Sequence, residues 1–93
     1  MWKVYTQNME LELKFQHCAA LIKTRNDVSN DDLAILYGNY KQALLGDNTT
    51  DRPLFLYFTA VAKWDAWTLC LGKSKEDAMR DYIAKVEEIF SKV

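Results

Sequence analysis

"SNDDLAILYGNYKQALLG", Ser29–Gly46, decides the fold class, because it contains both ends of a helix and an apolar stripe between them. Ser29 is a preferred helix-capping residue, and the acidic residues after it lie in the first turn, where the helix dipole favours negative charge. Gly46 is the residue type that ends a helix in the left-handed conformation. Helical spacing predicts that the inward stripe consists of Leu33, Leu36, Tyr37, Tyr40 and Leu44.

The first and last parts of the chain show the same helical periodicity. One helix is expected from about Met9 to Lys23, and residues 1–8, which fall outside its stripe, are expected to form a loose extension. Ser74 is predicted to cap the last helix, with Asp77 three residues on as a variant of the capping box. The two apolar faces are Leu11, Phe15, Cys18 and Ile22, and then Ala78, Tyr82, Ile83, Val86, Ile89, Phe90 and Val93.

Between these helices, the segment "LFLYFTAVAKWDAWTLCLG", Leu54–Gly72, is apolar nearly all round. Its alanines and the spacing of Val61, Trp64 and Thr68 predict a helix from about Thr59 onward. Periodicity leaves the first five residues of the segment open between strand and helix. Four amphipathic helices in one short chain can bury their apolar faces only against one another, so the sequence predicts an all-α four-helix bundle.

The composition excludes several classes of protein. The 93 residues suffice for one domain or a fragment of a larger protein, and 12 basic against 13 acidic residues give no charge excess for nucleic-acid binding. No apolar run approaches the ~20 residues of a membrane span. The N-terminal stretch "MWKVYTQNMELELK" lacks the apolar region of a secretory signal peptide, so a cytoplasmic protein is expected. Cys18 and Cys70 are expected to be buried thiols, with a single disulfide as the alternative.

The residues do not predict an enzyme. His17 is the sole histidine and is adjacent to Cys18, but neighbouring helical side chains point about 100° apart and form no nucleophile–base pair. Neither a catalytic pair of carboxylates nor a glycine-rich phosphate loop accompanies this histidine. A non-catalytic protein without metal or cofactor is therefore expected.

Aromatic and basic side chains share the predicted helices. For any one aromatic residue, core packing is the more common role, but a buried tyrosine hydroxyl needs a partner and lysine is rarely buried unless paired. Lys41 lies one turn beyond Tyr37, and Lys63 directly precedes Trp64. Lysines and hydroxyls with rings between them suit an anionic ligand that carries a flat base. The aromatic residues considered for such a ligand are Tyr37, Tyr40, Trp64, Trp67 and Tyr82.

In combination, "LYGNYKQALLGDNTTDRP", "AKWDAW" and "GKSKEDAMRDYIAKVEE" closely resemble the acyl-CoA-binding protein family. The resemblance covers the chain from about Leu13 to its end. It implies a bundle with up-down-down-up topology in residues 9–93 and a carrier or pool former for medium- to long-chain fatty-acyl-CoA. The residues that it assigns to the CoA head group are Lys23, Tyr37, Tyr40, Lys41, Lys63 and Tyr82, and those for the acyl chain are Leu33, Leu36 and Trp64.

The chain departs from the family pattern at three positions. Leu54 replaces the usual glycine, Thr59 stands where many members carry a ligand-contacting lysine, and Val61 replaces another polar residue. One contact of the family motif is therefore expected to be lost, which would lower the affinity for phosphate. Alternatively, the added apolar surface would line a broader acyl groove or meet a partner. Two alternatives stay open: an interaction module with weakened ligand binding, and the binding domain of a larger lipid-metabolism protein. The expected partners are fatty-acyl-CoA and, transiently, acyl-CoA-using enzymes or membrane surfaces, with the chain as a monomer.

Overall fold

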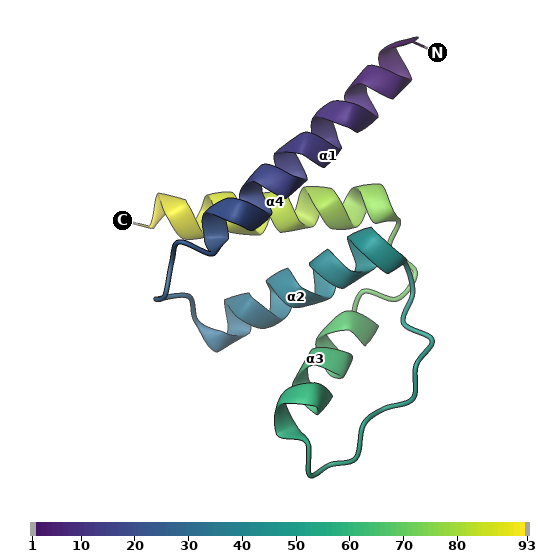
Figure 1. The fold of residues 1–93 in the computed structure, drawn as a ribbon, viewed down its shortest axis with the longest axis vertical. Coiled ribbons are helices and arrows are strands. Elements are labelled where there is room, and N and C mark those ends of the chain that lie inside the picture. Colours follow the sequence, from purple (N-terminus) through teal and green to yellow (C-terminus); the bar gives the residue numbers. More distant parts are fainter. Residues whose placement is uncertain (1, 93) are drawn as a thin grey trace.

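The computed structural model describes residues 2–92 as four helices, α1 (Trp2–Ile22), α2 (Asn30–Leu45), α3 (Phe58–Thr68) and α4 (Lys75–Ser91). No strand occurs in this part of the chain. Both α1 and α2 pack against α4, whereas α3 packs against α2 (Figure 1). The all-α four-helix prediction is confirmed. Within the described residues, no helix has the length and apolar character needed to cross a membrane.

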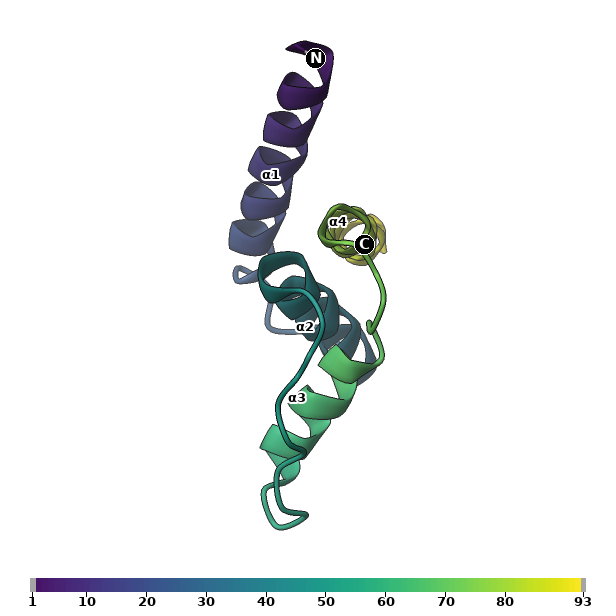
Figure 2. The same ribbon diagram turned by 90° about the vertical axis from the view of Figure 1, so that its right-hand side faces the viewer.

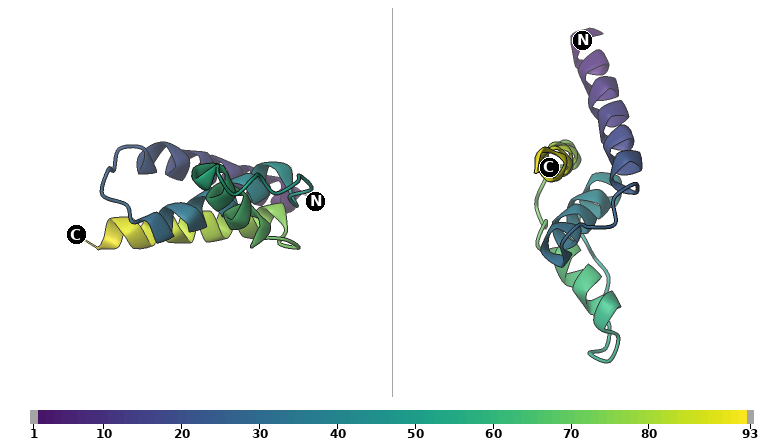
Figure 3. Two further views of the ribbon diagram at one scale, coloured as in Figure 1. Left: turned by 90° about the horizontal axis from the view of Figure 1, so that it is seen from below. Right: turned by 90° about the vertical axis from the view of Figure 1, so that its left-hand side faces the viewer.

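The arrangement is flat, with extents of 48, 35 and 16 Å along its principal axes. Figure 2 looks along α4 and shows α1, α2 and α3 following one another down the molecule, with α4 to one side. Figure 3 shows from below that α4 lies alongside α2. Helix α3 is therefore attached to the rest through α2, which leaves room for a pocket between α3 and α1.

The expected loose extension before residue 9 is wrong for residues 2–8, because α1 begins at Trp2. No proline or glycine interrupts residues 2–22, and extending a formed helix costs far less than starting one. Met1 and Val93, which the sequence placed in the extension and in the last apolar face, lie outside the described residues. The position of the domain boundary stays a prediction.

The two predicted serine caps are confirmed by their hydrogen bonds, whereas the left-handed conformation predicted for Gly46 is wrong. The Ser29 hydroxyl accepts from the backbone N–H of Asp32 at 3.1 Å, and that of Ser74 accepts from Asp77 at 3.0 Å. Gly46 ends α2 with φ +79° and ψ −152°, a positive-φ conformation outside the left-handed helical region. Its N–H donates to the carbonyl of Gln42 at 2.9 Å, which closes the last turn.

The core lies between α1, α2 and α4. The predicted stripe of α2 is partly wrong, since Leu33 and Leu44 are each 48% exposed and Tyr40 is 37% exposed. Helix α2 contacts both α3 and α4, and the face between these two neighbours is the one that is buried, including Gln42 and Ala43. The buried residues that form this core are Phe15, Cys18, Leu36, Ala43, Ala78, Tyr82, Ile83, Val86 and Ile89. Both cysteines are buried and free, so the disulfide alternative is wrong. Burial raises the pKa of each thiol.

The long connection between α2 and α3 is held along one side of α3. Both indole N–H groups of α3 donate to carbonyls of this connection, and one ion pair reinforces them. These contacts are Trp67 Nε1 to Gly46 O at 2.8 Å, Trp64 Nε1 to Thr50 O at 3.0 Å, and Arg52 to Asp65 at 2.9 Å. They fix α3 in position although it packs against one helix alone.

A buried amide holds the turn between α3 and α4 against the end of α2. Gln42, with 0% exposure, donates from Nε2 to Asp47 Oδ1 and to the carbonyl of Lys73, both at 2.8 Å. The same carboxylate oxygen accepts from the N–H of Gly72 at 2.8 Å. The Gly72 N–H and then the Gln42 amide hold the pKa of Asp47 below its usual range. The network joins the end of α2 to the turn that precedes α4.

Candidate ligand-binding site

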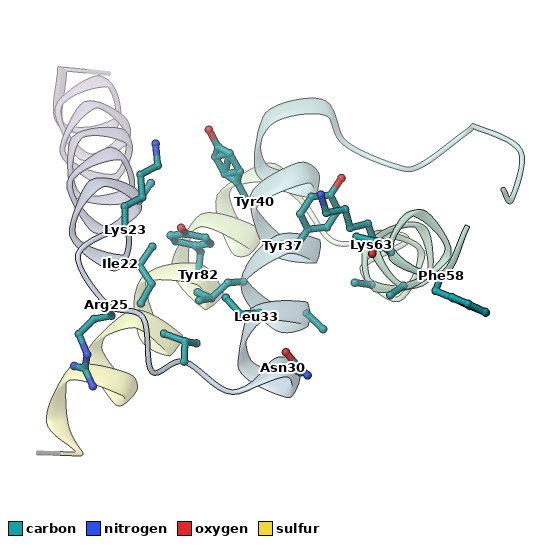
Figure 4. A pocket seen from close by; sticks show the side chains of 17 residues that line it. Ile22, Lys23, Arg25, Asn30, Leu33, Tyr37, Tyr40, Phe58, Lys63 and Tyr82 are labelled. Carbon is teal, nitrogen blue, oxygen red and sulfur yellow. The ribbon is translucent and has the colours of Figure 1, made fainter. Parts of the chain in front are cut away.

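A pocket of about 890 Å³ lies between α1, α2 and α3, with one side chain of α4 in its wall. All of the predicted site residues except Lys41 and Trp64 line this pocket, although they come from three helices and from the turn after α1. Those that line it are Lys23, Leu33, Leu36, Tyr37, Tyr40, Lys63 and Tyr82. Residues far apart in the sequence therefore meet at one cavity (Figure 4).

Amines and hydroxyls gather toward one end of the pocket. In Figure 4, Lys23 and Tyr40 lie toward this end on the α1 side of α2, and Tyr37 and Lys63 lie toward the same end on its α3 side. The Lys63 ammonium lies 5.5 Å from the centroid of the Tyr37 ring, a cation–π distance. This end can donate charged and neutral hydrogen bonds to an anionic group and offers ring surface to a flat one.

Two tyrosine rings, Tyr40 and Tyr82, line the inner wall at this end and pack against the buried ring of Phe15. Phe15 lies 5.6 Å from Tyr40 in a stacked arrangement and 5.0 Å from Tyr82 edge to face, while the two tyrosine rings are 5.9 Å apart. Tyr82 is 5% exposed, and burial, followed by the nearby Tyr40 and Cys18, raises the pKa of its hydroxyl to about 12. The hydroxyl therefore stays protonated at neutral pH and is available as a donor.

The remaining lining is mostly apolar. It runs along α2 and the start of α3, where Leu33 and Phe58 are 48% and 78% exposed. The other apolar members are Ala19, Ile22, Val28, Ala34, Leu36, Ala62 and Ala66. A charged end and an apolar wall in one cavity suit an amphiphile with an anionic head and a hydrocarbon tail.

The structure does not place Lys41 and Trp64 in the lining. The Lys41 ammonium lies 5.1 Å from the Trp67 ring centroid, over the seam between α2 and α3. The Trp64 indole is bound to the carbonyl of Thr50 in the connection before α3. Both side chains therefore stabilise the attachment of α3, and Lys41 is close to the pocket only through its position one turn beyond Tyr37 on the same helix.

Two polar residues that line the pocket, Arg25 and Asn30, were not predicted from the sequence. Arg25 pairs with Asp27 at 2.8 Å and lies over the ring of Phe90, 4.9 Å from its centroid. Both lie toward the end of the pocket opposite Lys23 and Tyr40 (Figure 4). Neither has a spacing that predicts a site, because the loop after α1 determines where they lie.

Comparisons of the sequence and of the structure with known proteins point to the same family. Residues 12–86 match the family described as acyl CoA binding protein. An acyl-CoA-binding protein of Gossypium hirsutum is 48% identical over 83 residues, which make up 88% of this chain and 93% of that protein. Acyl-CoA-binding protein homolog 1 of Caenorhabditis elegans is 43% identical over 83 residues, 88% of this chain and 96% of that one.

Two crystal structures have the same fold. Acyl-CoA-binding protein 2 of Oryza sativa has a TM-score of 0.84 and 45% identity, and the match covers 87% of this chain and 91% of that one. The protein titled ACBP from Moniliophthora perniciosa has a TM-score of 0.82 and 34% identity, with coverage of 87% and 81%. The family match, the sequence identities and the shared fold together show that this chain belongs to the acyl-CoA-binding protein family.

Proposed function

We propose that this protein binds fatty-acyl-CoA thioesters in the pocket between α1, α2 and α3. The observation that carries the proposal is the pairing of a lysine- and tyrosine-rich end with an apolar wall in one cavity. An acyl-CoA has the matching division, because its nucleotide head is phosphorylated and its tail is hydrocarbon. The names of two similar relatives, both acyl-CoA-binding proteins, support the same ligand class.

We assign the head group to the amine and hydroxyl end. Lys63 and Tyr37 approach each other across the seam of α2 and α3, and with Lys41 they would hold a phosphate group. Tyr40, Tyr82 and Lys23 would contact the nucleotide from the inner wall. The tail would lie along Leu33 and Leu36, and Trp64 would act by holding the connection before α3 rather than by lining the cavity.

Both ends of the ligand are needed for useful affinity. Burying a methylene contributes roughly 0.8 kcal/mol, so a long chain offers on the order of 10 kcal/mol before costs. Association and ordering oppose binding by about 4–15 kcal/mol. Head-group contacts therefore supply the remainder and the selectivity for CoA, and affinity should rise with chain length. We propose further that the protein is a carrier or pool former for medium- to long-chain acyl-CoA esters. In this role it acts as a monomer in the cytoplasm, without catalysis or cofactor.

A thermal-shift assay with palmitoyl-CoA separates a carrier from a pure interaction module. Ligand at 100 times its Kd should stabilise the folded chain by about 2.7 kcal/mol and raise the thermal midpoint by several degrees. CoA alone should give a smaller rise at the same concentration. An unchanged thermal midpoint with palmitoyl-CoA would contradict the proposal and would favour the alternative of a pure interaction module.

Thr59→Lys should strengthen binding of palmitoyl-CoA by roughly fivefold, the effect of one partly exposed charge contact. Thr59 lines the pocket, at the position where many family members carry a ligand-contacting lysine. The measurement is calorimetry at low and high salt, and the gain should shrink as salt screens the charge. Thr49→Lys adds the same charge on an exposed residue of the connection and serves as the control. Equal affinities of both variants would contradict the assignment of this wall to the ligand.

A further inference from the structure

The segment Leu54–Phe58, "LFLYF", presents five consecutive large side chains to solvent. Their exposed fractions run from 61% at Tyr57 to 78% at Phe58. We refer to these five residues as the apolar tip. The connection that contains them forms the lower end of the molecule in Figure 1, far from the start of α1. Exposed apolar patches in soluble folds commonly mark an interaction surface.

The exposure of the apolar tip is fixed by the backbone. The N–H of Tyr57 donates to the carbonyl of Leu54 at 2.9 Å, which closes a turn, and the N–H of Val61 donates to Tyr57 at 2.9 Å as α3 begins. The ion pair between Arg52 and Asp65 ties the residues just before the turn to α3 at 2.9 Å. The turn therefore holds these side chains outward, and none of them belongs to the core.

The shape and size of the apolar tip favour a lipid surface over a protein partner. A stable protein interface buries about 800 Å² on each side. Aromatic side chains offer about 150–250 Å² each when fully buried. The three aromatic side chains and two leucines of the apolar tip are 61–78% exposed, so they reach about that area only if a partner covers every exposed part of a single projecting turn. A projecting turn of leucine, phenylalanine and tyrosine has the composition of membrane-interface anchors, in which rings lie at the head-group level.

We propose that the apolar tip inserts into the interfacial layer of a lipid bilayer. The five residues carry no charge, and the nearest basic residue, Arg52, is paired with Asp65, so insertion is driven by apolar burial rather than by anionic lipids. Phe58 also lines the pocket, so a docked tip brings the pocket to the membrane surface. Only this last consequence rests on the proposed function, since an acyl-CoA could then pass between bilayer and pocket.

The test is flotation of the full chain with phosphatidylcholine vesicles, without added ligand. Leu54→Ser/Phe55→Ser should lower the vesicle-bound fraction on the order of tenfold, because it removes two apolar anchors. The matched control is Leu69→Ser/Leu71→Ser, which removes two side chains that are 88% and 62% exposed elsewhere on the surface and should leave binding unchanged. Wild-type binding should change little between low and high salt.

Several results would overturn the proposal. They are an absence of vesicle binding by the wild type, an equal loss in both variants, or binding that requires anionic lipids and disappears at high salt. A concentration-dependent dimer that the Leu54→Ser/Phe55→Ser variant abolishes would instead assign the apolar tip to a second copy of the chain. Each variant is checked for an unchanged thermal midpoint.

A ligand measurement keeps this inference separate from the proposed function. Leu54 and Phe55 are not among the residues that line the pocket, so both double variants should bind palmitoyl-CoA with wild-type affinity in calorimetry. Loss of vesicle binding with intact ligand binding supports the apolar tip. Vesicle binding by a chain that binds no acyl-CoA would overturn the proposed function and leave the apolar tip standing.

Discussion

Gly38→Ala is expected to destabilise the fold by about 2–3 kcal/mol, the upper range for forcing extra volume into a packed contact. A Cβ at Gly38 would lie 2.3 Å from the backbone carbonyl oxygen of Ala66 and 2.9 Å from its carbon. These are backbone atoms of α3 and cannot rotate away. Relief requires α3 to move off α2, and the pocket would lose the wall that carries Thr59 and Lys63.

The sign of this effect makes it a strict test. In an open helix interior, alanine is favoured over glycine by roughly 0.5–1 kcal/mol, so helix propensity alone predicts that Gly38→Ala stabilises the chain. Urea unfolding measures the free energy, and calorimetry with palmitoyl-CoA measures the accompanying loss of affinity. Ala84→Gly, at an exposed position of α4, reports the propensity effect by itself. A stabilised Gly38→Ala variant with normal ligand affinity would contradict the close packing of α2 and α3.

Lys41→Ala/Lys63→Ala is expected to weaken palmitoyl-CoA binding by about 100-fold, since hydrogen bonds to charged groups contribute about 1.5–3 kcal/mol each. Both ammonium groups lie along the seam between α2 and α3, over the rings of Trp67 and Tyr37. Loss of two exposed cation–π contacts should lower the free energy of unfolding by no more than about 2 kcal/mol. The measurements are titration calorimetry and urea unfolding.

A matched control removes two lysines elsewhere. Lys14 and Lys92 make surface ion pairs with Glu87 at 3.5 Å and Glu88 at 3.6 Å, and neither lysine lines the pocket. Lys14→Ala/Lys92→Ala changes the net charge by the same amount and should keep wild-type affinity. A large loss of stability with unaltered affinity in Lys41→Ala/Lys63→Ala would instead assign these two lysines to the attachment of α3.

The features of the fold that were predictable from the sequence are determined by local chemistry. The caps Ser29 and Ser74 act on backbone groups three residues away, so residue type and spacing suffice. The stripe of α1 was predictable because that helix packs on one neighbour, α4. The start of α1 was not predictable in this way, because residues 2–8 continue a helix that later residues nucleate.

The features that were not predictable depend on how α3 is placed. Helix α2 lies between α3 and α4, so the buried face includes Gly38 and Gln42, while Leu33 and Leu44 remain largely exposed. The same placement directs Trp64 to the carbonyl of Thr50. Spacing along one helix gives no information about such contacts, which arise between segments far apart in the chain.

The candidate site also has residues that were predictable from the sequence and residues that were not. Resemblance to a family, carried by a specific combination of residues, predicted nine site residues, of which seven line the pocket, including Tyr37, Lys63 and Tyr82. It could not give Arg25 and Asn30, which the loop after α1 places in the wall, or the position of Lys41 over Trp67. The roles of all these residues toward a ligand stay predictions.

Titration calorimetry of the wild-type chain with palmitoyl-CoA, palmitate and CoA tests the central claim most directly. If one pocket holds a phosphorylated head and an apolar tail, palmitoyl-CoA should bind at least 100-fold more tightly than either part alone, because each part makes only its own share of the contacts. Shorter acyl-CoA esters should bind progressively more weakly. Binding of palmitate as tight as that of palmitoyl-CoA, or no measurable binding of palmitoyl-CoA, would contradict it.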